Sequence, residues 1–123
     1  MKKLILLGAL AAVLTLAFAG VALAKEIQCT TLNCEGTSRA DTLFERVGNG
    51  LEDNIKGRRG GDVIDATGST NDVDNLFGNR GNDTLDATDG DDLDTLNGGP
   101  GTDECFGDEG DTFISCETIT ETP

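Results

Sequence analysis

A short pattern of polar and apolar residues recurs through most of the chain: an aspartate, any residue, and then an apolar residue. The triplets begin at Asp41, Asp53, Asp62, Asp74, Asp83, Asp94, Asp103 and Asp111. Because alternate residues of a strand share one face, each triplet predicts a very short strand whose apolar side chain enters a core. The apolar residues expected there are Leu43, Ile55, Ile64, Leu76, Leu85 and Leu96.

Glycine-rich loops stand ahead of three of these triplets. They are Gly57-Arg58-Arg59-Gly60-Gly61-Asp62, Gly78-Asn79-Arg80-Gly81-Asn82-Asp83 and Gly98-Gly99-Pro100-Gly101-Thr102-Asp103. Glycine lets the backbone turn tightly and expose its carbonyls to one side. The pattern therefore predicts stacked coils, each unit combining a turn with a very short strand. Stacking would gather carboxylate and carbonyl oxygens at an edge, and calcium prefers such hard oxygen ligands.

The pattern resembles the nonapeptide repeat G-G-x-G-x-D-x-U-x of the RTX (repeats-in-toxin) family over residues 36–115. The resemblance implies an all-β parallel β-roll with two facing sheets and Ca²⁺ between loops stacked at the same edge. It also implies that the aspartates closing the loops are ligands, with Asp62, Asp83 and Asp103 as the best candidates. The glycines that would shape their loops are Gly57, Gly60, Gly78, Gly81, Gly98 and Gly101.

The spacing of the triplets predicts two unlike edges. The longer spacings all precede Asp53, Asp74 and Asp94, so these aspartates should share one edge with long, acidic loops. Asp41, Asp62, Asp83 and Asp103 should form a regular ladder on the other edge. We expect two calcium sites there, between successive loops ending at Asp62, Asp83 and Asp103. Arg39 replaces a family glycine near Asp41, and the long-loop edge either binds ions irregularly or binds none.

The first 24 residues have the pattern of a secretory signal peptide. Lys2 and Lys3 precede an apolar run from Leu4 to Phe18, and Ala22-Leu23-Ala24 ends the segment. We expect cleavage before Lys25 and an extracellular or cell-surface location. An uncleaved membrane anchor is the alternative, since residues 4–24 could just span a bilayer.

Four cysteines allow three disulfide pairings. We favour Cys29–Cys34 and Cys105–Cys116, one at each end of the repeat. The expected organisation is thus an N-terminal cap over 25–35, the calcium-binding roll over 36–115 and a C-terminal tail over 116–123.

Charge narrows the functional classes. The chain has a formal net charge of −14 and no histidine, which excludes histidine-dependent catalysis and disfavours nucleic acid as a partner. So acidic a chain with few large apolar residues should not fold until its acids are neutralised. We therefore expect a secreted, non-enzymatic, monomeric protein that folds on binding Ca²⁺. The alternatives are a surface-adhesion or matrix scaffold that contacts its partner through the long-loop edge, and a small carboxylate hydrolase.

Three arginines, Arg58, Arg59 and Arg80, lie in the glycine-rich loops. They form either an anion-binding patch or, as we favour, exposed charges that moderate the repulsion between neighbouring acids.

Overall fold

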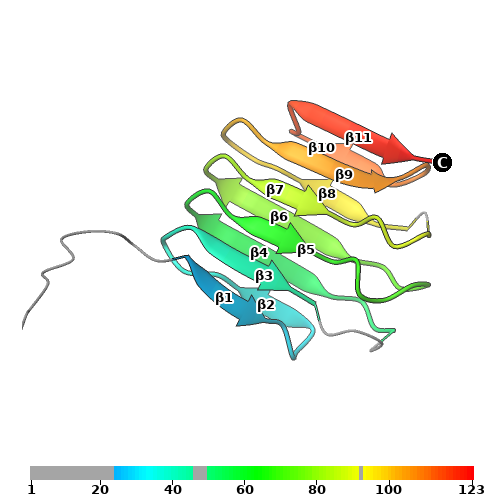
Figure 1. Cartoon of the computed structure of the whole chain (residues 1–123), viewed down its shortest axis with the longest axis horizontal. Helices are drawn as coiled ribbons and strands as arrows, with labels where there is room; N and C mark the ends of the chain where they lie inside the picture. The colour runs from blue at the N-terminus through cyan, green and yellow to red at the C-terminus, as the bar shows by residue number, and fades with distance from the viewer. Residues whose placement is uncertain (1–23, 46–49, 92) are drawn as a thin grey trace, which may run out of the picture.

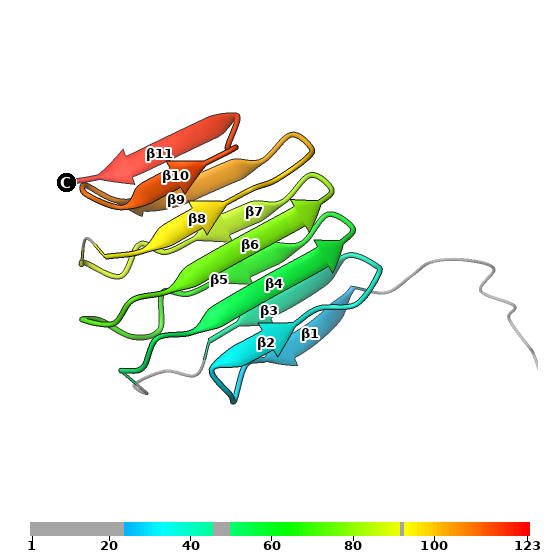
Figure 2. The ribbon, with the colours of Figure 1, turned by 180° about the vertical axis from the view of Figure 1, so that it is seen from behind.

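The computed structural model describes residues 24–45, 50–91 and 93–123, and it is a parallel β-solenoid of two facing sheets (Figures 1 and 2). The chain passes from one sheet to the other with each successive strand. One sheet contains β1 (Lys25–Gln28), β3 (Asp41–Phe44), β5 (Val63–Asp65), β7 (Thr84–Asp86), β9 (Glu104–Asp108) and β11 (Thr118–Thr122), in that order. The other contains β2 (Asn33–Glu35), β4 (Asn54–Arg59), β6 (Asn75–Arg80), β8 (Thr95–Asn97) and β10 (Thr112–Ile114). The β-roll predicted from the triplets is confirmed.

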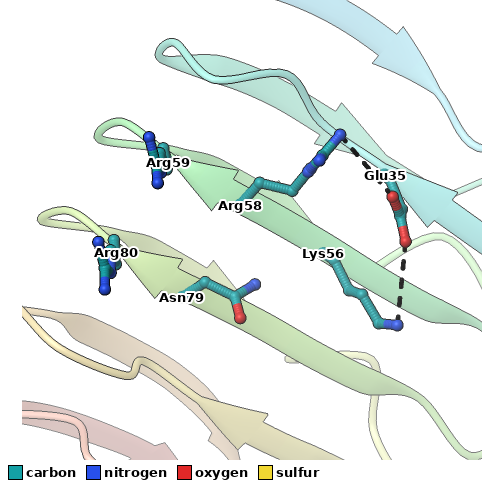
Figure 3. A pocket seen from close by; sticks show the side chains of 6 residues that line it. All are labelled: Glu35, Lys56, Arg58, Arg59, Asn79 and Arg80. Carbon is teal, nitrogen blue, oxygen red and sulfur yellow. Dashed lines mark ion pairs between the residues drawn. The ribbon is translucent and has the colours of Figure 1, made fainter.

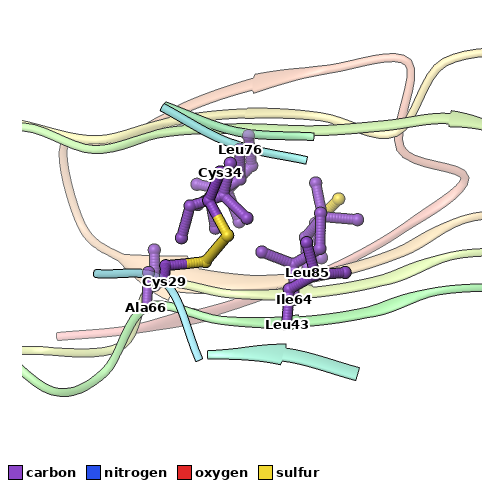
Figure 4. Packing of buried hydrophobic residues seen from close by; sticks show 11 residues of the cluster. Cys29, Cys34, Leu43, Ile64, Ala66, Leu76 and Leu85 are labelled. Carbon is purple, nitrogen blue, oxygen red and sulfur yellow. A yellow bond between two sulfur atoms is a disulfide. The ribbon is translucent and has the colours of Figure 1, made fainter. Parts of the chain in front are cut away.

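The core consists of short columns of side chains that run across the coils. In one sheet Leu43 lies in register with Ile64, and Ile64 with Leu85 (Figure 4). In the other sheet Ile55 lies beside Leu76, which lies beside Leu96. All six side chains are fully buried, as their place in the triplets predicts.

The two edges of the roll differ as the spacing predicts. The glycine edge comprises the turns that lead from an even-numbered strand to the next odd-numbered one and end at Asp41, Asp62, Asp83 and Asp103. The long-loop edge comprises the opposite turns, which end at Asp53, Asp74, Asp94 and Asp111.

Both ends of the chain extend the roll beyond the range marked by the triplets. Strands β1 and β2 pair with β3 and β4, so residues 25–35 form a first coil rather than a separate cap. Strand β11 pairs with β9 and occupies most of the expected tail. The favoured disulfide pairing is confirmed: Cys29–Cys34 joins the two sheets in the first coil, and Cys105–Cys116 secures the last coils. Residues 1–23, which carry the signal-peptide prediction, lie outside the described residues, and none of the described residues forms a helix able to span a membrane.

Successive coils approach most closely at the glycine edge. A side chain at Gly81 (φ 145°) would overlap the carbonyl oxygen of Gly60 in the preceding coil. Arg58 has a φ of 86°, and it occupies the loop position at which Gly99 stands two coils later. Left-handed backbone is unfavourable for a residue with a side chain, so Arg58 strains its turn.

Substitutions at these two positions should have opposite effects on stability. Arg58→Gly should raise the free energy of unfolding by about 1 kcal/mol because it relieves left-handed strain. Gly81→Ala should lower it by about 3 kcal/mol or more, because the coils must separate. Chemical denaturation in excess calcium measures both. Equal effects of the two substitutions would contradict this description of the turns.

Candidate metal sites

A column of aspartates runs along the glycine edge and joins each coil to the next. The backbone N–H groups of Asp41, Asp62 and Asp83 each donate to Oδ1 of the aspartate one coil later, at 2.8 Å in every case. Glu117 continues the column, since its Oε2 accepts the N–H of Asp103 at 2.7 Å. Asp41, Asp62, Asp83 and Asp103 are all almost fully buried. The aspartates predicted to form a ladder therefore do so, through side chain to backbone bonds.

The second carboxylate oxygen of each loop aspartate has no hydrogen-bond partner. This is Oδ2 in Asp62, Asp83 and Asp103 and Oδ1 in Asp41, whose Oδ2 accepts the N–H of Thr37. In the loops ending at Asp62, Asp83 and Asp103, this free oxygen occupies the space that a side chain on the first loop glycine would fill. Those glycines are Gly57, Gly78 and Gly98, while Gly60, Gly81 and Gly101 form the turns between coils at positive φ.

The donors at the glycine edge fit a calcium ion. Each loop offers one buried carboxylate oxygen without a partner. The glycine residues beside it have no side chain that could cover their backbone carbonyl groups. An all-oxygen set of carboxylate and carbonyl groups suits Ca²⁺, which accepts flexible geometry. If an ion is bound, Asp62, Asp83 and Asp103 are the residues that would hold it. Its positive charge would balance the negative charge of their free carboxylate oxygens.

The long-loop edge carries a second column of the same kind. Asp53 N–H donates to Asp74 Oδ1 at 2.9 Å, Asp74 N–H to Asp94 Oδ1 at 2.7 Å, and Asp94 N–H to Asp111 Oδ1 at 3.1 Å. Oδ2 of Asp74 and of Asp94 is buried without a partner. Asp53, Asp74 and Asp94 thus occupy equivalent positions in consecutive coils, as their spacing predicts.

Two groups of carboxylates come close enough to hold a metal ion, among the residues that the structure describes, and both lie on the long-loop edge. One is Glu45, Asp53 and Asp74, and the other is Asp72, Asp89 and Asp91. Within each group one oxygen per residue lies within 4.8 Å of the others. The predicted ligands included Asp53 and Asp74 but not Glu45, Asp72, Asp89 or Asp91. A signal was present for Glu45, because it precedes a long loop at the position where later coils have Ala66 and Ala87.

Burial disfavours the charged form of a carboxyl group and so raises the pKa values of Glu45, Asp72, Asp83 and Asp103. Burial raises the pKa of Asp74 to about 8 and that of Asp94 to about 7, and neighbouring carboxylates add to both shifts. The pKa of Asp62 and that of Asp89 rise to about 6 for the same reasons. The roll therefore holds its carboxylates where they favour a bound proton or a bound cation.

Positive charge gathers instead on the outer face of β4 and β6. Figure 3 shows Lys56, Arg58, Arg59 and Arg80 around a shallow pocket, with Glu35 opposite. Glu35 pairs with Lys56 Nζ at 4.0 Å and with Arg58 Nη1 at 3.9 Å, and all three side chains are about half exposed. Exposed ion pairs contribute little to stability. The arrangement agrees with the expectation that these basic side chains moderate the repulsion between neighbouring acidic residues. None of them pairs with a buried aspartate in the described part of the chain.

Comparison with known proteins identifies the repeat. The family model of the RTX calcium-binding nonapeptide repeat matches residues 68–93 and 94–114, which span the loops and strands from the turn before β6 to the end of β10. No curated protein and no solved structure matches the chain. These residues therefore carry the RTX calcium-binding nonapeptide repeat, and the match supports a calcium-binding repeat protein.

Proposed function

We propose that this chain is an exported, non-enzymatic calcium-binding roll whose folding depends on calcium. One observation carries the proposal: eleven buried side-chain oxygens of the described residues have no hydrogen-bond partner, and all eleven belong to aspartate or glutamate. Leaving a carboxylate buried and unpaired is strongly unfavourable. A divalent cation that binds the folded chain would remove this penalty and stabilise the roll by an amount that grows with the logarithm of the cation concentration.

Calcium fits these oxygens and the expected location of the chain. Extracellular calcium-binding modules have dissociation constants of about 10⁻⁴ to 10⁻³ M, so such a roll would stay unfolded at the low calcium level inside a cell. Two disulfides favour an oxidising compartment. The signal-like sequence of residues 1–24 supports export, and the lack of histidine in the chain supports a role outside catalysis.

Far-UV circular dichroism during a calcium titration tests this proposal. The purified protein should be largely unstructured in EDTA and should gain the β-sheet spectrum as calcium rises into the millimolar range. Magnesium serves as the matched control and should not produce the transition, because it prefers strict octahedral geometry and keeps its water ligands. A full β-sheet spectrum in EDTA, or none in calcium, would refute the coupled mechanism.

A substitution of Asp83 should weaken two coil junctions at once. The Asp83 carboxylate accepts the N–H of Asp62, and the Asp83 N–H donates to the Asp103 carboxylate. Asp83→Asn preserves the hydrogen-bond acceptor but removes the charge, and we expect the calcium midpoint to rise about tenfold. Asp86→Asn is the control, since Asp86 lies on the outward face of the same coil and its carboxylate accepts hydrogen bonds from Thr88. A similar midpoint for the two variants would show that the aspartate column does not bind calcium.

The pH dependence of stability should change sign with calcium. In the folded chain the pKa of Asp74 is about 8 and that of Asp94 about 7, against an ordinary value of 3.8. The folded state thus binds more protons than the unfolded state between these values. In EDTA the chain should therefore retain more β-sheet structure at pH 5 than at pH 8.

In saturating calcium the order should reverse, because protons then compete with calcium for the same oxygens. Far-UV circular dichroism in EDTA and thermal unfolding in calcium, each at both pH values, give the comparison. A β-sheet signal in EDTA that increases from pH 5 to pH 8 would contradict the raised pKa values.

A further inference from the structure

Glu45 occupies an interior position that the other coils fill with small or apolar residues. Its N–H donates to the carbonyl of Asp65 at 3.0 Å, which places Glu45 beside Ala66. In the same way Cys29 lies beside Glu45, and Ala66 lies beside Ala87. All four residues are at most 3% exposed. Glu45 is thus the one charged residue in a buried column of Cys29, Glu45, Ala66 and Ala87.

The Glu45 carboxylate meets two other buried carboxylates. One oxygen each from Glu45, Asp53 and Asp74 lies within 4.8 Å of the others, and the three residues are 3%, 2% and 0% exposed. The backbone N–H groups of Ser69 and Gly68 face the Glu45 carboxylate, but neither of its buried oxygens makes a hydrogen bond of full geometry. Oδ2 of Asp74 is also buried without a partner.

We propose that Glu45, Asp53 and Asp74 form a calcium site of a second kind, built from side chains instead of a glycine loop. This inference rests on the proposed calcium-dependent folding and adds a site at the edge that lacks the glycine motif. Ca²⁺ binds oxygen ligands in flexible geometry, so three carboxylate oxygens that lie within 4.8 Å of one another are close enough to share one ion. Magnesium suits the group less well, because it demands near-ideal octahedral geometry and keeps its water ligands.

The proposed site is specific to one coil. The positions equivalent to Glu45 in the next two coils are Ala66 and Ala87, which offer no ligand although Asp74 and Asp94 continue the column. An ion at Glu45 would join the end of β3 to the starts of β4 and β6. It would therefore tie β3 and β4 to the next coil, and β3 and β4 lie outside the residues that the RTX family model matches.

Two substitutions of Glu45 test the site. Glu45→Ala introduces the residue that Ala66 and Ala87 already place in this column, so the variant should fold in calcium. Glu45→Gln preserves size but removes the charge. Glu52→Gln is the matched control: Glu52 is exposed in the same loop, and its Oε1 accepts a hydrogen bond from Asn75, which glutamine can also accept.

The readout is the number of calcium ions bound per chain at saturation, counted by native mass spectrometry of the purified protein, with circular dichroism to check folding. Glu45→Ala should bind one ion fewer than the wild type and the Glu52→Gln control. Glu45→Gln should lose that ion or bind it about tenfold more weakly. An unchanged count in Glu45→Ala would overturn the site, as would failure of both Glu45 variants to fold in calcium. A wild-type chain that binds no calcium would instead overturn the proposed function.

Discussion

The hydrogen bond from an aspartate N–H to the carboxylate of the aspartate one coil later is the interaction on which this roll depends. It recurs on both edges at 2.7–3.1 Å and fixes the height and register of every repeated coil. Each such bond uses one carboxylate oxygen and, except at Asp111, whose Oδ2 accepts the N–H of Asp108, leaves the other buried without a partner. The same columns that align the strands therefore stack like charges through the molecule, which favours a bound counter-charge. In the proposed mechanism, calcium binding and folding thus share one structural cause.

The two edges meet this requirement with different chemistry. On the glycine edge, small residues leave room for one free aspartate oxygen per loop, so the remaining ligands must come from the backbone. On the long-loop edge the turns carry additional acids, and carboxylates from different coils converge in groups of three. Regular turns thus favour a uniform row of ions, whereas long turns favour individual sites that depend on single residues such as Glu45.

Most of the fold could be predicted from the sequence because the repeat is periodic. The triplets determine the inward column of Leu43, Ile64 and Leu85, and their unequal spacing assigns each loop to its edge. The first and last coils could not be predicted, because β1, β2 and β11 lack the triplet and are positioned by pairing with neighbouring strands and by the disulfides. Asp72 and Asp89 were missed for a related reason: long loops have no period, so only the folded backbone brings their carboxylates together.

The central claim is that folding consumes calcium ions, and the linkage between stability and calcium measures it most directly. The free energy of unfolding would be determined by denaturation at a series of free calcium concentrations, at constant ionic strength. Its slope against the logarithm of calcium concentration gives the number of ions taken up on folding. We predict a slope of about two ions or more, since at least two coil junctions of the glycine edge present free aspartate oxygens. A slope of zero would show that the roll folds without calcium and would contradict the account.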